Sequence, residues 1–139
     1  TVSTHYMDEV YDHDSISAKP NFSILIYPVI SMDDKITHKG SKTNLLGNIP
    51  SEDLVEFYSN EKQIDSLTPP TFLVHATDDK AVPVENSIHY YIALKDNNVP
   101  VEMHIYENGG HGFGLGVKGT SFYWAESCEQ WLNANNFLD

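Results

Sequence analysis

The chain has 139 residues, 40% of them hydrophobic, and a formal net charge of −12 in which all eight basic residues are lysine. This length suits one domain, and the charge excludes the basic surface that binding to nucleic acid or to an anionic membrane needs. The single cysteine, Cys128, excludes an internal disulfide and does not identify a compartment.

The first half of the chain is predicted to hold one buried strand and one short helix. Residues 1–21 are polar and are typical of a loop. The apolar run 22–27 is nearly continuous, which is typical of a parallel strand covered on both faces. An irregular excursion over 29–50 follows, with one helical turn expected near 43–46. A serine N-cap and apolar residues at helical spacing then predict a helix over 52–59.

The second half predicts two more strands and two longer helices. The run 71–75 is apolar and follows two prolines, and 101–106 alternates as a strand with one wetter face does. Helical spacing of apolar residues predicts helices over 84–95 and 121–134, and a glycine-rich loop over 109–119 precedes the last one.

Strands that alternate with helices predict a parallel sheet with helices packed on its faces. We therefore expect an α/β fold of the three-layer α/β/α kind, in one domain over 1–139, with right-handed crossovers. Function in such sheets gathers at the carboxyl ends of the strands.

Two residues at that edge are candidate catalytic groups, Asp79 after the second strand and His111 after the third. An acid that orients a histidine, and a histidine that accepts and returns a proton, are the last two members of a Ser–Asp–His triad. Glycines on both sides of His111 would let its ring reach a cleft. Asp78 is the rival for the acid, and His75 is expected to be a strand-end residue satisfied by backbone rather than a catalyst.

The first member of a triad is missing, because no Gly-x-Ser-x-Gly occurs in the 139 residues. The other candidate nucleophiles lack the small flanking residues of a nucleophile elbow or lie in predicted strands and helices. They are Ser23, Ser31, Ser87, Ser121 and Cys128.

No metal site or cofactor is predicted, since no histidine pair has ligand spacing on a helix. His5, Asp12, His13 and Asp14 could hold an ion only opportunistically. The stripe of Trp124 and Trp131 is expected to be core.

These residues resemble the α/β-hydrolase superfamily, in the branch of acetyl-xylan-esterase-like, feruloyl-esterase-like and lipase-like proteins. The resemblance spans residues 1 to about 137, and the segments that carry it are 21–30, 69–79, 82–83 and 104–114. The common glycine after the strand-end histidine is Ala76 here. The resemblance implies the catalytic pair Asp79 and His111, esters of acetylated or feruloylated carbohydrate as substrates, and a role in xylan degradation.

The resemblance also implies that this chain is the C-terminal half of an esterase, with the nucleophile serine and the oxyanion hole upstream. The chain alone would then be inactive. Its strands would be the last three of an eight-stranded sheet, and the strand at 22–27 would present an open edge that favours self-association. The alternative is a truncated, non-catalytic hydrolase-like binding or interaction module. The sequence leaves the compartment open between secreted, periplasmic and cytoplasmic, and Thr1–Tyr6 shows no signal-peptide pattern.

Overall fold

The computed structural model of the chain describes residues 2–6, 17–116 and 120–138. Its sheet has three parallel strands, ordered β1 (Ser23–Ile26), β2 (Thr71–Ala76) and β3 (Val101–Tyr106), which begin in register. β2 lies between the other two, and all six of its residues are buried, whereas β1 and β3 are mostly half-buried. The three strands thus occupy the segments that the apolar runs predict.

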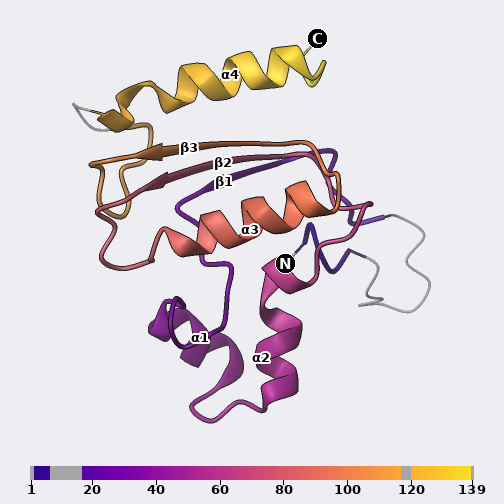
Figure 1. Ribbon diagram of the computed structural model, residues 1–139, viewed down its shortest axis with the longest axis vertical. Coiled ribbons are helices and arrows are strands. Elements are labelled where there is room, and N and C mark those ends of the chain that lie inside the picture. Colours follow the sequence, from indigo (N-terminus) through magenta and orange to yellow (C-terminus); the bar gives the residue numbers. More distant parts are fainter. Residues whose placement is uncertain (1, 7–16, 117–119, 139) are drawn as a thin grey trace.

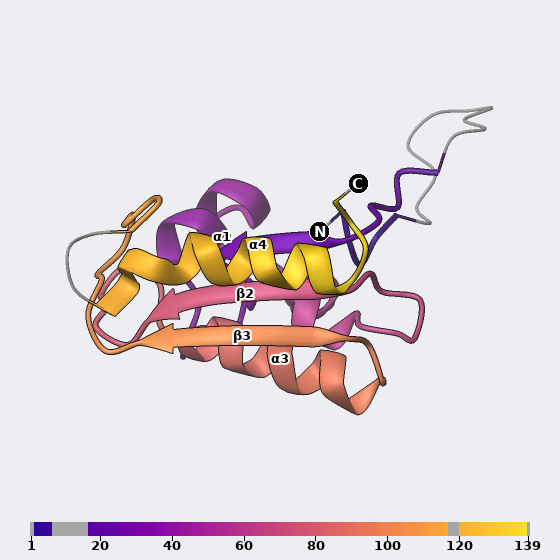
Figure 2. The ribbon, with the colours of Figure 1, turned by 90° about the horizontal axis from the view of Figure 1, so that it is seen from above.

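Helices cover both faces of this sheet. α4 (Trp124–Ala134) lies on one face, preceded by the short 3₁₀ helix η2 (Thr120–Tyr123), and α3 (Glu85–Asp96) lies on the other (Figure 1). Seen from above, α4 runs along the strands on its side of the sheet (Figure 2). The expected three-layer α/β/α arrangement is therefore confirmed.

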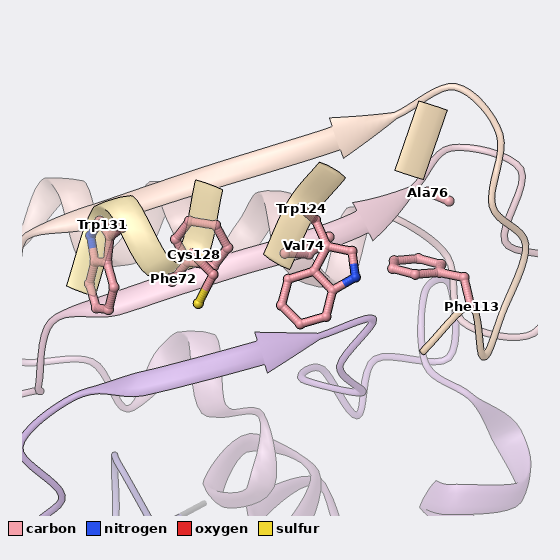
Figure 3. Close-up of a cluster of buried hydrophobic side chains, with 7 residues drawn as sticks. All are labelled: Phe72, Val74, Ala76, Phe113, Trp124, Cys128 and Trp131. Atoms are coloured by element: carbon pink, nitrogen blue, oxygen red, sulfur yellow. The ribbon is translucent and has the colours of Figure 1, made fainter. Parts of the chain in front are cut away.

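The alternation of side chains along β2 divides the core into two clusters. Figure 3 shows the cluster beneath α4, in which the two tryptophans of that helix lie over the even-numbered residues of β2. Its buried members are Phe72, Val74, Ala76, Phe113, Trp124, Cys128 and Trp131. The cluster on the α3 side comprises Ile30, Leu73, Tyr90, Leu94 and Val99. Trp124 and Trp131 are each 5% exposed, which confirms their role in the core.

The excursion between β1 and β2 holds more helix than the sequence predicts. α1 spans Lys39–Leu46, and α2 (Glu52–Tyr58) is followed by the short 3₁₀ helix η1 (Asn60–Lys62). α1 begins earlier than expected because His38, a residue outside the usual N-cap set, accepts a hydrogen bond from the Ser41 N–H through Nδ1 (3.2 Å). Both helices lie beyond α3, on the side of the molecule away from α4 (Figure 1). No helix in the described part of the chain is long and apolar enough to span a membrane.

Candidate active site

The two predicted site residues meet at the carboxyl edge of the sheet. Asp79 lies in the loop 77–82 after β2, and His111 lies in the loop 109–116 after β3. The Nδ1 atom of His111 is 2.8 Å from Oδ2 of Asp79. Parallel strands end at one edge, so two loops 32 positions apart in sequence supply a single hydrogen-bonded pair.

Asp79 is fixed by its own loop. Its side chain is fully buried, and its Oδ1 accepts hydrogen bonds from the N–H groups of Ala81 and Val82, both at 2.9 Å. Burial works against the charged form of the carboxyl, but these two donors and the His111 ring outweigh it, so the pKa of Asp79 lies below its ordinary value. The carboxylate is therefore ionised at neutral pH and accepts hydrogen bonds only.

His111 presents one nitrogen to Asp79 and the rest of its ring to the surface. An ionised carboxylate needs a donor, so Nδ1 carries the proton, and in the neutral ring Nε2 holds the free lone pair. The side chain is 41% exposed, in contrast with its buried partner. This arrangement, a buried acid behind an accessible histidine, suits a base that exchanges protons with a bound group.

Asp78, the rival of Asp79, has a different task. Its Oδ1 accepts hydrogen bonds from the N–H groups of Gly109 (2.8 Å) and Gly110 (2.7 Å). Asp78 therefore ties the loop after β3 to the loop after β2, while Asp79 reaches the imidazole. The sequence weighs the two acids only as alternatives for one role, and the direction in which each side chain turns separates them.

Two further contacts hold the loop that carries His111. A Cβ atom at Gly109 would lie 3.0 Å from Cβ of Ala76, so the loop presses on the end of β2 at a point where only glycine fits without a shift. At its other end, the indole N–H of Trp124 donates to the Gly114 carbonyl (2.9 Å). Residues 109–116 are thus anchored although they are rich in glycine; residues 117–119 of the predicted loop lie outside the described part of the chain.

Tyr27 is a site residue that sequence reasoning missed. It directly follows β1 and has a φ angle of 42°, a left-handed conformation that is uncommon for a bulky residue. Its ring meets the rings of His111 and Phe113 edge to face, with centroids 4.9 and 4.8 Å away. Backbone strain of this kind tends to be kept at functional sites. A Tyr–Pro pair after a strand was the only signal, and it does not reveal the φ angle.

The rejected nucleophiles are held in other contacts. Oγ of Ser31 is in a fully buried side chain and accepts from the Asp33 N–H, and Oγ of Ser87 bonds to the ring of His75. The Cys128 thiol is buried, and burial raises its pKa, so it stays protonated. None of these three groups has the environment of an activated nucleophile.

No group of three potential ligands that could hold a metal ion occurs within the described ranges. Of the four residues named above for an opportunistic ion, Asp12, His13 and Asp14 lie outside those ranges. His5 bonds to the Phe57 carbonyl through Nε2 (2.9 Å).

A comparison with models of protein families identifies the family of this chain. The model of the prolyl oligopeptidase family, a family of α/β hydrolases, matches residues 26–136. The chain belongs to the prolyl oligopeptidase family. The matched segment includes β2, β3 and both loops that carry the Asp79–His111 pair, so the resemblance to α/β hydrolases is confirmed.

The relatives of this family member include esterases. It is 46% identical over 103 residues to an acetylxylan esterase of Xylanibacter ruminicola, and 35% identical over 116 residues to endo-1,4-beta-xylanase B of Butyrivibrio fibrisolvens. Among solved structures, the acetyl ester-xyloside bifunctional hydrolase of Caldicellulosiruptor lactoaceticus superposes with a TM-score of 0.92 at 40% sequence identity.

The chain matches only part of each of these proteins. The alignment covers 71% of the chain but 22% of the acetylxylan esterase, and 81% of the chain but 18% of the xylanase. The superposition on the bifunctional hydrolase covers 99% of the chain and 52% of that protein. The chain thus spans about half the length of the solved hydrolase.

Proposed function

We propose that this chain is the C-terminal portion of a serine esterase domain, in which Asp79 and His111 serve a nucleophile that these 139 residues do not contain. The observation that carries the proposal is the 2.8 Å contact between the buried carboxylate and the accessible imidazole at the carboxyl edge of the sheet. The half-length match to a solved ester hydrolase supports it.

In the proposed reaction, the serine oxygen bonds to the ester carbonyl carbon while its proton passes to Nε2 of His111. Asp79 stays ionised, accepts from Nδ1 and stabilises the imidazolium that forms. When the bond from the carbonyl carbon to the alcohol oxygen breaks, His111 gives the proton to the departing alcohol. A water molecule then repeats the attack and releases the acid, which regenerates the serine.

The position of His111 indicates where such a serine would stand. Adjacent strands lie about 4.8 Å apart, so β1 and β3, with β2 between them, are separated by roughly 10 Å. The loop after β3 nevertheless carries the His111 ring back to Tyr27, at the end of β1. A further strand paired to β1 would end beside this ring, which is the place that the nucleophile of an α/β hydrolase requires.

The proposed substrates are esters of acetylated or feruloylated carbohydrate, with xylan as the polymer. Support comes from two relatives whose names specify acetyl esters, the acetylxylan esterase and the acetyl ester-xyloside hydrolase, and from the xylanase. A neutral sugar ester is also compatible with the charge of −12. Of the two acyl groups, both relatives favour acetyl.

The test uses the complete reading frame that contains these residues, with 4-nitrophenyl acetate, acetylated xylan and methyl ferulate as substrates. Hydrolysis should fall by about 10³-fold or more in the His111→Ala variant. This chain alone should hydrolyse 4-nitrophenyl acetate no faster than its own His111→Ala variant. A clear rate above that control would show that the nucleophile is within the 139 residues. A reading frame without a serine half would favour the non-catalytic interaction module.

We also propose that β1 mediates self-association when no other strand covers it. Within the described residues, β1 pairs only with β2. The N–H groups of Ser23 and Tyr27 point toward β2, so by alternation those of Ile24 and Ile26 point to the open edge. In size-exclusion chromatography, Ile24→Pro should shift the chain from dimer to monomer without loss of helical signal, whereas Leu25→Pro should unfold it. A monomer in the unaltered chain at micromolar concentration would contradict this proposal.

A further inference from the structure

His75 is a buried titratable group that the proposed mechanism does not use. It is the fifth residue of β2, and its side chain is fully buried. The alternation along β2 directs it to the α3 face, on the opposite side of the sheet from Val74 and Ala76. A buried imidazole is costly unless both of its nitrogens find partners, and the partners of His75 lead back to the site.

The contacts of His75 define its tautomer. Nε2 lies 3.0 Å from the Val82 carbonyl, which can only accept, so Nε2 carries a proton. Nδ1 lies 2.7 Å from Oγ of Ser87 on α3. Burial lowers the pKa of His75, and this effect outweighs the contacts that favour its charge. The neutral ring therefore accepts the Ser87 hydroxyl at Nδ1 and donates from Nε2.

The same Nε2 atom also approaches the proposed acid. It lies 3.3 Å from Oδ2 of Asp79, the oxygen that His111 contacts at 2.8 Å. One carboxylate oxygen thus faces two imidazoles, one buried and neutral, the other accessible. Val82 contacts both residues. Its carbonyl meets Nε2 of His75, and its N–H is one of the two donors to Oδ1 of Asp79.

From this geometry we infer that His75 is a positioning residue that keeps Oδ2 of Asp79 directed at His111. This inference rests on the proposed function, because it assigns His75 a role toward the same catalytic pair. Nε2 of His75 contacts both the carboxylate and the far end of its loop, so the two cannot shift independently. The Ser87 hydroxyl locks the ring to α3, which connects the acid to the core rather than to the surface.

The neutrality of His75 is part of this role. A neutral ring donates its Nε2–H to the Val82 carbonyl and lies 3.3 Å from Oδ2 without bringing a positive charge to Asp79, so the full charge of the carboxylate remains for the imidazolium of His111. A protonated His75 ring 3.3 Å from Oδ2 would itself attract the carboxylate of Asp79 and would weaken the attraction between Asp79 and the imidazolium of His111. The titratable groups that meet His75 in the described structure are Asp79 and, through the shared carboxylate, His111.

Two near-isosteric variants of the chain test this role. The amide of His75→Gln reaches the place of Nε2 and can still donate there, whereas the shorter amide of His75→Asn reaches only the place of Nδ1. NMR of ¹⁵N-labelled histidine at about pH 9, where imidazoles are neutral, reports the tautomer of His111, assigned with a His111→Gln spectrum. The Nδ1–H form should dominate in the unaltered chain and in His75→Gln. In His75→Asn the Nε2–H form, which a free imidazole prefers, should become the major one.

A folded His75→Asn variant in which His111 keeps the Nδ1–H tautomer would overturn the inference. If His75→Asn does not fold, the Ser87→Ala variant is used instead. Ser87→Ala keeps His75 but removes the bond that ties its ring to α3. A His111 tautomer that is unchanged in Ser87→Ala would also overturn the inference. The readout does not need ester hydrolysis. A tautomer that responds as expected, in a protein whose complete reading frame hydrolyses no ester, would therefore reject the proposed function and keep the positioning role.

Discussion

The loops after β2 and β3 hold Asp79 and His111 in position by different kinds of contact. The loop 77–82 fixes its acid locally, because Asp79 accepts from two N–H groups within three residues of itself. The loop 109–116 has an internal bond from the Gly116 N–H to the Phe113 carbonyl and is held from outside by Asp78 at one end and by Trp124 at the other. Oδ1 of Asp79 is thus held by its own turn, whereas the loop of His111 is held by the surrounding structure.

This difference indicates how each residue depends on the rest of the molecule. The bonds to Oδ1 of Asp79 follow once β2 and its turn form, whereas the direction of Oδ2 also depends, as inferred above, on His75 and its bond to Ser87 on α3. The position of His111 also requires β3 to pair with β2 and α4 to dock, since Trp124 belongs to that helix. The accessible member of the pair is therefore the one that depends most on long-range contacts.

The largest expected effect comes from breaking the pair itself. In the complete reading frame, Asp79→Asn should lower kcat/KM for 4-nitrophenyl acetate by about 10⁴-fold, because a neutral amide cannot hold the tautomer or stabilise the imidazolium. The double variant with His111→Ala should be little slower than either single variant, since the two residues act as a unit. Losses that multiply in the double variant would show that the residues act separately.

A smaller effect is expected from a substitution at Gly109 that pushes the loop 109–116 away from the end of β2. An alanine at Gly109 would bring Cβ within 3.0 Å of both Ala76 and Phe113, and such overpacking costs about 1–3 kcal/mol. Urea denaturation of Gly109→Ala should show this loss of unfolding free energy. The comparison variant is Gly40→Ala in α1, where the new Cβ would lie 3.1 Å from the His38 ring that caps this helix. Alanine favours helix, which offsets part of the cost of displacing that ring, so this variant should lose less unfolding free energy than Gly109→Ala.

The smallest expected effect separates the two neighbouring acids. Asp78→Ala removes the acceptor for Gly109 and Gly110 at an exposed position, for about 1 kcal/mol. Amide hydrogen exchange should speed up at those two glycines and stay unchanged at Ala81 and Val82, while Asp79→Ala should show the reverse. Equal acceleration in both loops by either variant would mean that the loops form one cooperative unit and would remove the contrast.

Much of this architecture could be predicted from the sequence, and the exceptions have identifiable causes. Periodicity placed the strands and the larger helices, and the rule for carboxyl ends brought Asp79 and His111 together. Spacing from His75 favoured Asp79 over Asp78 but could not exclude Asp78 or reveal its separate role, because both acids follow the same strand and only side-chain direction distinguishes their contacts. The left-handed backbone of Tyr27 leaves no composition signal, since the surrounding fold imposes it.

The buried polar contacts were the hardest to predict. A strand-end histidine satisfied by backbone was expected at position 75, and its bond to the Val82 carbonyl confirms that. Its links to Ser87 and to Asp79 depend on how α3 docks on the sheet, which no local pattern specifies. Long-range packing therefore decides the finer contacts of the site.

The close approach of Gly109 to Ala76 has a consequence for how these proteins can vary. The space between the two backbones holds one methyl group, and here it belongs to position 76. Positions 76 and 109 should therefore share the space for one methyl group. The double variant Ala76→Gly with Gly109→Ala moves that methyl group from one loop to the other. Sequences that carry glycine after the strand-end histidine should accordingly accept alanine at the position that corresponds to Gly109 only where the ring that corresponds to Phe113, which lies equally close, can also shift.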